Sequence, residues 1–268
     1  MDILEQRPSP RPRFDRLATS YDQLRAIPPA ALEAIADGVI RLGGARPTSH
    51  FFEPGIGTGR IAIPVVRRGY RYTGLDVSAP MLTILIQGGL PGCDVVHGDV
   101  RALPFADASF DIALSTHLLY LVTGWPGALA EIRRVLRPGG AYLHCFEAST
   151  GTLAALAIAE QWRAAVGAVS AESTWPETTT DADVLTSLYD SGAVVESAVA
   201  ARWCQRRTVV DFLAGYPDRV RPLYPSISDD TFAGVAEQFD AWVRRTFPPD
   251  AEVGHDIRFE VHAAHWYH

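Results

Sequence analysis

The sequence predicts an α/β fold with a doubly wound, mostly parallel sheet and a helical cap. Three observations support this prediction. From residue 49 onward, short apolar runs alternate with segments whose apolar residues recur at helical spacing. The first apolar run leads into a glycine-rich turn, a typical connection between a strand and a helix in such folds. After Phe146 the alternation changes, and longer helical segments separate the remaining strands.

The N-terminal part is predicted to be helical. The segment FDRLATSYDQLRA at 14–26 has the pattern of a short helix. Pro28 and Pro29 begin a second helix, at about 30–42, because proline is favoured in the first helical turn. Gly43 and Gly44 end it.

Five strands with intervening helices follow. The predicted strands are Ser49–Glu53, Arg71–Asp76, Asp94–His97, Phe110–Ser115 and Ala141–Phe146. The predicted helices are Arg60–Arg68, Ala79–Gln87 and Trp125–Arg137. The last one places Trp125, Leu129, Ile132 and Leu136 on one face and stops before Pro138. Strands separated by helices imply a parallel sheet whose ligand lies at the carboxyl ends of the strands.

Two further strands, at Ala193–Cys204 and Asp256–His265, bring the predicted sheet to seven. The helices expected in this part are Thr152–Ala168, Asp181–Ser191 and a stretch that Ser228 caps and Pro248 follows. In that stretch Phe232, Val235, Phe239 and Trp242 share a face. We therefore expect one domain with a cap. The core takes up 1–147, 181–204 and a last strand in 255–268, and the cap is formed by 148–180 and 205–254.

Composition excludes several classes of function. The net charge of −7 argues against nucleic acid or an anionic membrane surface as the main partner. All 24 basic residues are arginines, so lysine Schiff-base catalysis and a Walker P-loop are absent from this sequence. Three scattered cysteines indicate a reducing compartment without a disulfide framework. We find no signal-peptide pattern and no apolar run of the ~18 residues that a membrane span needs, and expect a cytoplasmic protein.

The glycine-rich turn FFEPGIGTGR at 51–60 indicates a nucleotide-binding loop. Glycines permit positive φ and let the backbone approach a ligand closely, and the amides of the following helix face anionic groups. A dinucleotide-binding loop has the spacing G-x-G-x-x-G. Here the glycines are Gly55, Gly57 and Gly59, and Arg60 stands at the third dinucleotide position, which disfavours a dinucleotide.

Two acidic residues favour a nucleoside ligand. Asp76 ends the second strand, where a carboxylate accepts hydrogen bonds from ribose hydroxyls. Asp99 follows the third strand, where its carboxylate can accept from an adenine amine and the amide of Val100 can donate to a ring nitrogen. Two carboxylates without a basic phosphate clamp suit a nucleoside that carries positive charge elsewhere.

These motifs together resemble those of the class I S-adenosylmethionine-dependent methyltransferases of the small-molecule type. The matching segments cover residues 14–147 in order: FDRLATSYD at 14–22, EPGIGTG at 53–59, GLDVS at 74–78, GDVRALPF at 98–105, SFDIALSTHLLY at 109–120 and ALAEIRRVLRPGGAYL at 128–143. The resemblance implies a seven-stranded, Rossmann-like methyltransferase fold and S-adenosylmethionine as the cofactor. One departure is Pro64, which should restrict the helix after the glycine loop to a short regular piece.

The resemblance also implies roles for individual residues. Glu53 and the three glycines would hold the methionine and ribose part, and Asp76 the ribose. Val77 and Met81 would lie beside the adenine, and Asp99 and Val100 at its edge. Ser115 would meet the methionyl ammonium, and Tyr21 would close over the methionyl end. The implied cofactor-binding set is Tyr21, Glu53, Gly55, Gly57, Gly59, Asp76, Val77, Met81, Asp99, Val100 and Ser115.

Methyl transfer from a sulfonium needs alignment of the nucleophile more than acid–base chemistry. A general base is needed for a protonated nitrogen, a hydroxyl or an unactivated carbon. His117 follows the fourth strand and Glu147 the fifth, and these two loops flank the methyl group in this fold. With Tyr21, they are the candidate catalytic residues. His117 can equally cap a helix, and Glu147 can be a solvated loop acid.

Four of the eight histidines lie in the tail, but His262 and His265 would point to opposite faces of a strand, so we expect no metal site. His255 is the one most suited to line a pocket. The aromatic residues of the cap favour a small apolar or aromatic acceptor, methylated on nitrogen, oxygen or carbon. The predicted partner is therefore a small molecule, with no nucleic acid and no membrane, and the protein a monomer or homodimer. A nucleic-acid or protein methyltransferase is disfavoured, since no Asn/Asp-Pro-Pro-aromatic turn follows the fourth strand. The remaining alternative is a protein that binds the cofactor without methyl transfer, such as a cyclase or a binding module.

Overall fold

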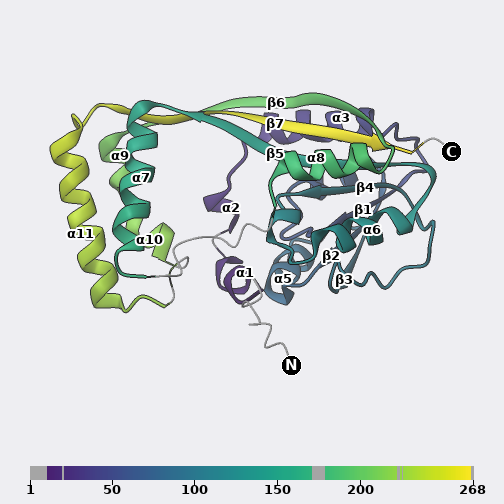
Figure 1. Cartoon of the computed structure of the whole chain (residues 1–268), viewed down its shortest axis with the longest axis horizontal. Helices are drawn as coiled ribbons and strands as arrows, with labels where there is room; N and C mark the ends of the chain where they lie inside the picture. Colours follow the sequence, from purple (N-terminus) through teal and green to yellow (C-terminus); the bar gives the residue numbers. More distant parts are fainter. Residues whose placement is uncertain (1–10, 20, 171–178, 222–223, 225, 267–268) are drawn as a thin grey trace.

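A single seven-stranded sheet organises the chain (Figure 1). The structure, a computed structural model, describes residues 11–19, 21–170, 179–221, 224 and 226–266. The strand order is β3-β2-β1-β4-β5-β7-β6. The strands are β1 His50–Pro54, β2 Arg71–Asp76, β3 Cys93–His97, β4 Phe110–Thr116, β5 Leu136–Gly151, β6 Val194–Thr208 and β7 Glu252–His265. β1 to β5 are parallel, and β7 is antiparallel to both of its neighbours, which confirms the predicted mostly parallel sheet.

Helices cover both faces of the sheet. They are α1 Arg11–Leu17, α2 Tyr21–Leu24, α3 Pro29–Leu42, α4 Ala62–Arg67, α5 Ala79–Gln87, α6 Trp125–Val135, α7 Leu153–Gly167, α8 Asp181–Asp190, α9 Val209–Leu213, α10 Tyr216–Val220 and α11 Asp229–Thr246, with the 3₁₀ turn η1 at Leu119–Leu121. α3, α4 and α5 pack on one face, and α6 and α8 on the other. The prediction of one helix at 14–26 was wrong: the segment forms α1 and α2, separated by a turn at 18–19.

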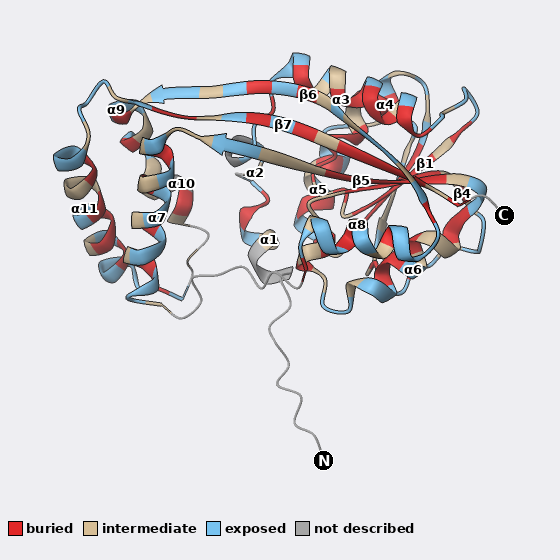
Figure 2. Ribbon diagram, turned by 45° about the horizontal axis from the view of Figure 1, so that its top comes forward, coloured by how far each residue is buried: buried red, intermediate tan, exposed pale blue. Residues whose placement is uncertain are grey.

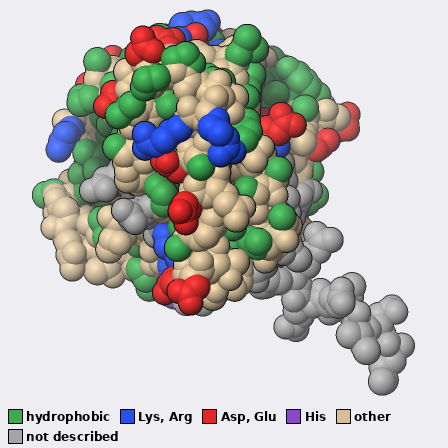
Figure 3. Space-filling view, turned by 90° about the vertical axis from the view of Figure 1, so that its left-hand side faces the viewer, with side chains coloured by type: hydrophobic (Ala, Val, Ile, Leu, Met, Phe, Trp, Pro, Cys, Tyr) green, Lys and Arg blue, Asp and Glu red, His purple; other side chains and the backbone are tan. Residues whose placement is uncertain are grey.

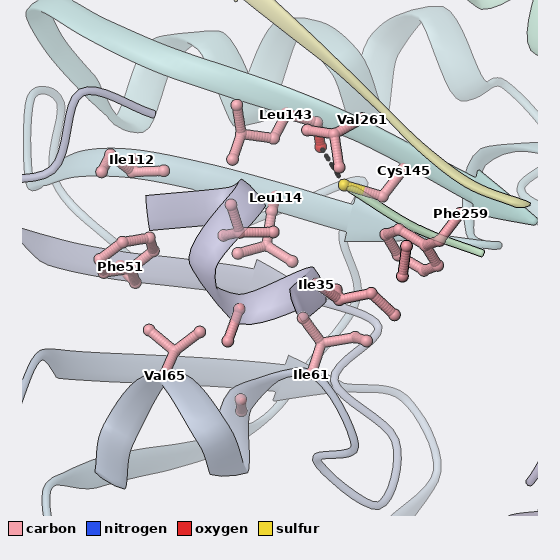
Figure 4. Packing of buried hydrophobic residues seen from close by; sticks show 14 of the residues in the cluster. Ile35, Phe51, Ile61, Val65, Ile112, Leu114, Leu143, Cys145, Phe259 and Val261 are labelled. Atoms are coloured by element: carbon pink, nitrogen blue, oxygen red, sulfur yellow. Dashed lines mark hydrogen bonds between the residues drawn. The ribbon is translucent and has the colours of Figure 1, made fainter. Parts of the chain in front are cut away.

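The core lies on both sides of the parallel strands. Phe51 and Phe52 are adjacent in β1 and point to opposite faces, the first toward α3 and α4 and the second toward α6. Figure 4 shows Phe51 with Ile35 of α3 and Val65 of α4 in the first of these clusters. Burial on both faces explains why the strands read as continuous apolar runs.

α4 is short for a local reason. It was predicted over 60–68 and spans six residues, with Pro64 at its third position. The first-turn N–H groups of a helix have no intrahelical acceptor, so proline removes no hydrogen bond there. The expectation of a short regular helix beside Pro64 is confirmed.

Three strands run beyond the parallel core (Figure 1). β5 was predicted to end at Phe146, β6 to end at Cys204 and β7 to begin at Asp256, and all three are longer. The added residues pair with one another, as in Gly151 with His255 and Thr208 with Glu252. Backbone pairing, rather than an apolar pattern, thus stabilises these added residues. We define the strand extension as 146–151 of β5, 252–260 of β7 and 201–208 of β6.

The strand extension leads to a helical lobe, formed by α7, α9, α10 and α11 (Figure 1). Trp162 of α7 lies at its centre, with its ring 5.3 Å from that of Tyr216 and 4.9 Å from that of Phe239. Phe232, Val235 and Phe239 are buried in this cluster and Trp242 packs against it, as their spacing predicted. Figure 2 shows the contrast between the buried residues of the parallel core and the exposed ones along the strand extension. Figure 3 shows hydrophobic, basic and acidic side chains intermixed on the far end of the helical lobe. The predicted cap boundaries at 148, 180, 205 and 254 stay a prediction.

Candidate functional site

The loop after β1 has the backbone conformation that glycine permits. Gly55, Gly57 and Gly59 have φ of 74°, 55° and 82°. A Cβ on Gly55 would lie 2.9 Å from Leu118 Cδ1, and one on Gly59 would lie 2.5 Å from Leu85 Cδ1. A Cβ on Gly57 would meet no atom within 4 Å. A side chain at Gly55 or Gly59 would therefore displace a leucine side chain, whereas the Cα of Gly57 faces open space, as a glycine does that a ligand approaches.

Asp76 fixes this loop to the tip of β2. Its Oδ2 accepts from the amide of Gly57 at 2.8 Å, and its Oδ1 accepts from the amide of Ser78 at 2.8 Å. Burial raises the pKa of this carboxyl, although the backbone hydrogen bonds oppose the shift. One carboxylate oxygen of Asp76 thus holds the backbone of Gly57, and the other binds the amide of Ser78, the residue that caps α5.

Glu53 lies inside the protein at the end of β1. Its Oε2 accepts from the hydroxyl of Tyr72 at 2.7 Å. Burial raises its pKa to about 8, so the carboxyl is largely protonated at neutral pH. The buried acid thus has a hydrogen-bond partner within the protein, and its predicted role toward the cofactor stays a prediction.

The predicted adenine side is formed by residues of differing exposure. Met81 and Val100 are buried, and Val77 is half-buried, with its carbonyl accepting from His97 Nε2 at 3.1 Å. Asp99 is held by Arg101, whose Nη2 lies 2.6 Å from Asp99 Oδ2, and this contact lowers the pKa of the carboxyl. The Asp99 carboxylate already has a partner in this state.

Ser115 and the residues after it lie at the tip of β4. The Ser115 hydroxyl is buried and lies 2.7 Å from the hydroxyl of Tyr142. The next two side chains have buried polar atoms without a partner, Thr116 Oγ1 and His117 Nε2. Such atoms usually bind something in a functional state, because an unmet buried polar group costs about 1–3 kcal/mol.

His117 and Glu147 lie close together. His117 follows β4 as predicted, but Glu147, predicted in a loop after the fifth strand, lies within β5, because that strand continues to Gly151 by pairing with β7. His117 Nε2 lies 3.9 Å from Glu147 Oε2, and only 14% and 15% of the two side chains is exposed. Burial, and then the nearby Arg25 and Arg60, lower the pKa of His117 to about 3. The imidazole is therefore neutral, and the pair forms neither an ion pair nor a hydrogen bond. His117 also has φ of 53°, an unusual conformation for a residue with a side chain.

α1 and α2 close over the glycine loop. The hydroxyl of Ser78 donates to Asp15 of the α1 helix at 2.5 Å, and that of Thr58 donates to Asp22 of α2 at 2.5 Å. Tyr21 of α2 stacks under Arg60, whose guanidinium carbon lies 5.1 Å from the ring centre. Tyr21 thus lies beside the loop, and its role over the methionyl end stays a prediction.

Sequence reasoning missed two residues of this region. Arg60 was seen only as a mismatch to the dinucleotide pattern, yet it also bonds the carbonyl of Arg25 and so holds α2. His144 of β5 is buried, with Nε2 2.8 Å from Asp181 Oδ1 and Nδ1 without a partner. The basic residue directly after the glycines was a usable signal for Arg60. His144 and Asp181 are 37 residues apart in the chain, so the sequence contained no signal for their pairing.

A pocket of about 350 Å³ lies between α4 and α5, at one side of the loop. Thr58 and Asp22 line it, with Ile63, Val66 and Leu85. None of the predicted cofactor-binding residues is among its lining residues, so it is distinct from the candidate site. Within the described part of the chain, no group of three or more His, Cys, Asp or Glu side chains is placed to hold a metal ion, and no helix is long and apolar enough to cross a bilayer.

Comparison with known proteins finds a family match for part of the chain. Residues 52–144 match the family model described as "Methyltransferase domain". A malonyl-[acyl-carrier protein] O-methyltransferase of Serratia marcescens is 32% identical over 130 residues, 48% of this chain and 49% of the relative. The ubiquinone/menaquinone biosynthesis C-methyltransferase UbiE of Paracoccus denitrificans is 36% identical over 135 residues, 47% of this chain and 54% of the relative. The chain thus spans about half the length of these relatives.

Solved structures share the whole fold at low identity. A putative methyltransferase of Bacillus halodurans has a TM-score of 0.57 at 13% identity, covering 87% of this chain and 99% of that one. The [4+2]-cyclase SpnF has a TM-score of 0.59 at 19% identity, covering 96% of this chain and 94% of that one. At such identities the likeness concerns the fold.

Proposed function

Because residues 52–144 form a methyltransferase domain of the class I, S-adenosylmethionine-dependent type, we propose that the whole chain transfers the sulfonium methyl of S-adenosylmethionine to a small apolar or aromatic molecule. The observation that carries the proposal is the contact of Asp76 with Gly57. This contact joins a carboxylate at the tip of β2 to a glycine that has positive φ and no protein atom within 4 Å of the position of a Cβ. This arrangement suits a nucleoside that lies across the carboxyl edge of the sheet.

The residues present fit the cofactor. Gly57 leaves room for the backbone to approach a ligand, and Thr116 Oγ1 and His117 Nε2 are buried polar atoms without a partner in the protein. In this proposal Asp76 and Asp99 bind the ribose and the adenine, with Val77, Met81 and Val100 beside the base. Glu53 and the loop glycines hold the methionine and ribose part, and Ser115 meets the ammonium group through its carbonyl. When bound, the cofactor supplies an electrophilic methyl group on sulfur.

The chain's own residues position the acceptor and exclude water. Tyr21 and Arg60 close α2 over the loop, which keeps water away from the reacting groups. His117 is neutral and can accept a proton from the acceptor, but a pKa of about 3 makes it a weak base, so this role requires an acceptor whose hydroxyl, nitrogen or carbon proton is itself acidic. Glu147, 3.9 Å away, stabilises the imidazolium that this proton transfer forms.

The nature of the acceptor is inferred from the surroundings and from relatives. Two relatives, matched over about half of their length, are named malonyl-[acyl-carrier protein] O-methyltransferase and ubiquinone/menaquinone biosynthesis C-methyltransferase. Methylation on carbon suits a proton acceptor next to the methyl donor, whereas methylation of a carboxylate oxygen, which is already ionised, needs none. We also propose that the protein is a cytoplasmic monomer or homodimer and that its partner is a small molecule.

Two measurements test the function. Calorimetric titration with S-adenosylmethionine should give binding at micromolar concentration, and its absence would refute the proposal. Incubation with the cofactor and a panel of apolar acceptors, followed by mass spectrometry, should give S-adenosylhomocysteine together with a methylated product. Cofactor binding with a changed but unmethylated acceptor would instead support the cyclase-like alternative, which shares this fold with SpnF.

A further inference from the structure

We propose that the acceptor carries an apolar chain, and that this chain lies along the inner side of the strand extension, from Glu147 to Leu156 and Leu153 of α7. The inference rests on the proposed function, since it assigns the reacting end of the acceptor to His117 and Glu147. It adds the class of acceptor, a molecule with an extended hydrocarbon part, and the surface that binds this part.

The inner side is defined by alternate residues of paired strands. In β5 it consists of Glu147, Ser149 and Gly151, which lie opposite Phe259, Ile257 and His255 of β7. Directly opposed residues of antiparallel strands point to the same face. Phe259 packs in the core beneath α3, and Val253, further along the same face, packs in the helical lobe. The inner side therefore faces both parts of the molecule.

This side connects the candidate site to α7. From Glu147 to Gly151 the strand advances four residues, which is ~13 Å at the rise of a β-strand. At the end of this path a Cβ on Gly151 would lie 3.1 Å from His255 Cε1 and 3.2 Å from Leu156 Cδ2. Gly151, His255 and Leu156 thus meet at one point, and Gly151 has no side chain to block it.

The end of the path at α7 carries two exposed leucines, and Arg207 lies on the same face of the sheet, opposite Val253. Leu153 is 87% exposed and Leu156 53% exposed. They are three residues apart and so share a helix face, while Ala155, Ile158 and Trp162 of the same helix are buried in the lobe. Burial, and then Arg206, lower the pKa of His255, so its ring is neutral at pH 7. The lobe does not use these leucines in its own packing, and a hydrocarbon chain would remove them from water.

Position distinguishes these leucines from other exposed apolar residues. Single exposed hydrophobic residues are common and need no ligand. Ile86 of α5 is such a residue, 62% exposed and outside both the strand extension and the helical lobe. Leu156, in contrast, touches the face that begins at Glu147. This continuity with the candidate site is the reason for assigning the acceptor's chain to it.

The test measures chain-length dependence of binding. The fluorescent probe 1-N-phenylnaphthylamine is bound to the full-length protein and displaced with 1-hexanol, 1-octanol and 1-decanol. Affinity should rise about threefold for each added methylene. The extended chains of all three alcohols fit within the ~13 Å path, so the rise should continue through 1-decanol. Equal affinity for the three alcohols would overturn the inference.

A double variant, Leu153→Asp with Leu156→Asp, tests the place of binding. It should bind 1-decanol at least tenfold more weakly, whereas the matched control Ile86→Asp should bind as the wild type does. Position 153 is the first residue of α7, where an acidic side chain is favoured, so the helix should be retained. Unchanged 1-decanol affinity in the double variant would overturn the inference. A second result would also overturn it. If the wild type is a dimer and the double variant is a monomer that still binds 1-decanol, then a second copy of the chain, and not the acceptor, covers the leucines.

Failure of this inference can be separated from failure of the proposed function. The same three proteins are titrated with S-adenosylmethionine. Cofactor binding in all three, together with a flat response to chain length, would overturn the inference alone. No cofactor binding in the wild type would refute the proposed function and, with it, the assignment of the reacting end.

Discussion

The backbone amide of Gly57 donates to Oδ2 of Asp76 at 2.8 Å, which joins the loop after β1 to the tip of β2. The same carboxylate accepts from the amide of Ser78 at the start of α5. One side chain thus orders the two segments to which the ribose contacts are assigned. The first two predictions concern this arrangement.

Asp76→Asn should weaken S-adenosylmethionine binding at least a hundredfold. The amide side chain keeps the shape but loses one acceptor and the charge, so one backbone N–H is left without its partner. The free energy of unfolding should fall by about 1–3 kcal/mol. Calorimetry and urea denaturation measure the two effects. Glu147→Ala should leave cofactor affinity intact, and equal affinity in Asp76→Asn and the wild type would refute the ribose assignment.

Gly57→Ala separates backbone strain from ligand contact. A side chain at positive φ costs about 1–2 kcal/mol. No protein atom lies within 4 Å of a Cβ at this position, so no clash adds to the cost. Gly44 provides a matched control, with φ of 60° and equally open surroundings. Both alanine variants should unfold at similarly reduced urea concentration, and only Gly57→Ala should lose cofactor binding. Cofactor binding that survives in Gly57→Ala would contradict the assigned approach of the ligand to the loop.

Local signals predicted the elements of the parallel core well. β2 and α5 have the predicted bounds, Arg71–Asp76 and Ala79–Gln87, because Ser78 caps the helix and Gly88 follows it. The glycines, Asp76 and His117 could be proposed as site residues because they stand next to strand ends. These features depend on neighbours in the chain.

Features that depend on distant partners were not predicted. The residues of β5 after Phe146 are polar or small, and only their pairing with β7 makes them a strand. No glycine or proline marks the break between α1 and α2. The two helices are instead held by separate contacts, Asp15 with Ser78 and Asp22 with Thr58. The contact of Arg101 with Asp99 was likewise missed, because the role assigned to Asp99 was considered without its neighbour's charge.

Glu53 should make stability depend on pH. Its pKa is about 8 in the folded protein, compared with 4.5 for a glutamate that is exposed to water. The folded state therefore binds the proton more tightly, and its stabilisation is full below pH 4.5 and is lost as pH rises toward 8. Between these values the free energy of unfolding should fall by about 1.4 kcal/mol per pH unit relative to Glu53→Gln, which does not titrate. Urea denaturation of both proteins at pH 5, 6, 7 and 8 measures the difference. Parallel pH curves for the two proteins would show that Glu53 titrates normally.

His117→Asn should reduce kcat by about 10²–10⁴-fold, the contribution of a general base. Asparagine accepts the positive φ at this position, so backbone strain does not explain the loss. Cofactor affinity measured by calorimetry should stay within threefold of the wild type. Retained kcat in the variant would remove His117 from the catalytic residues.

The pH profile of the wild type provides a second test of His117. Because its pKa is about 3 in the folded protein, the imidazole stays neutral and able to accept a proton from pH 7 down to pH 5. The rate of S-adenosylhomocysteine formation should therefore show no loss centred near pH 6.5. In contrast, the stability that this group contributes is present above pH 6.5 and is lost as pH falls toward 3. A rate that halves near pH 6.5 would mean that His117 is exposed to solvent in the working enzyme.

Arg101→Ala should increase cofactor affinity. In the structure Arg101 Nη2 lies 2.6 Å from Asp99 Oδ2 and its Nε contacts both carboxylate oxygens. An adenine amine must share or replace this contact. Because both side chains are partly exposed, the pair is worth a few tenths to about 1 kcal/mol, so its removal should strengthen binding about two- to fivefold. Raising the salt concentration should produce a similar gain in the wild type and none in Arg101→Ala, since salt screens exposed ion pairs. Asp99→Asn supplies the reference, with at least tenfold weaker binding. If Arg101→Ala weakens binding as strongly as Asp99→Asn does, Arg101 positions the Asp99 carboxylate for the adenine and does not compete with it.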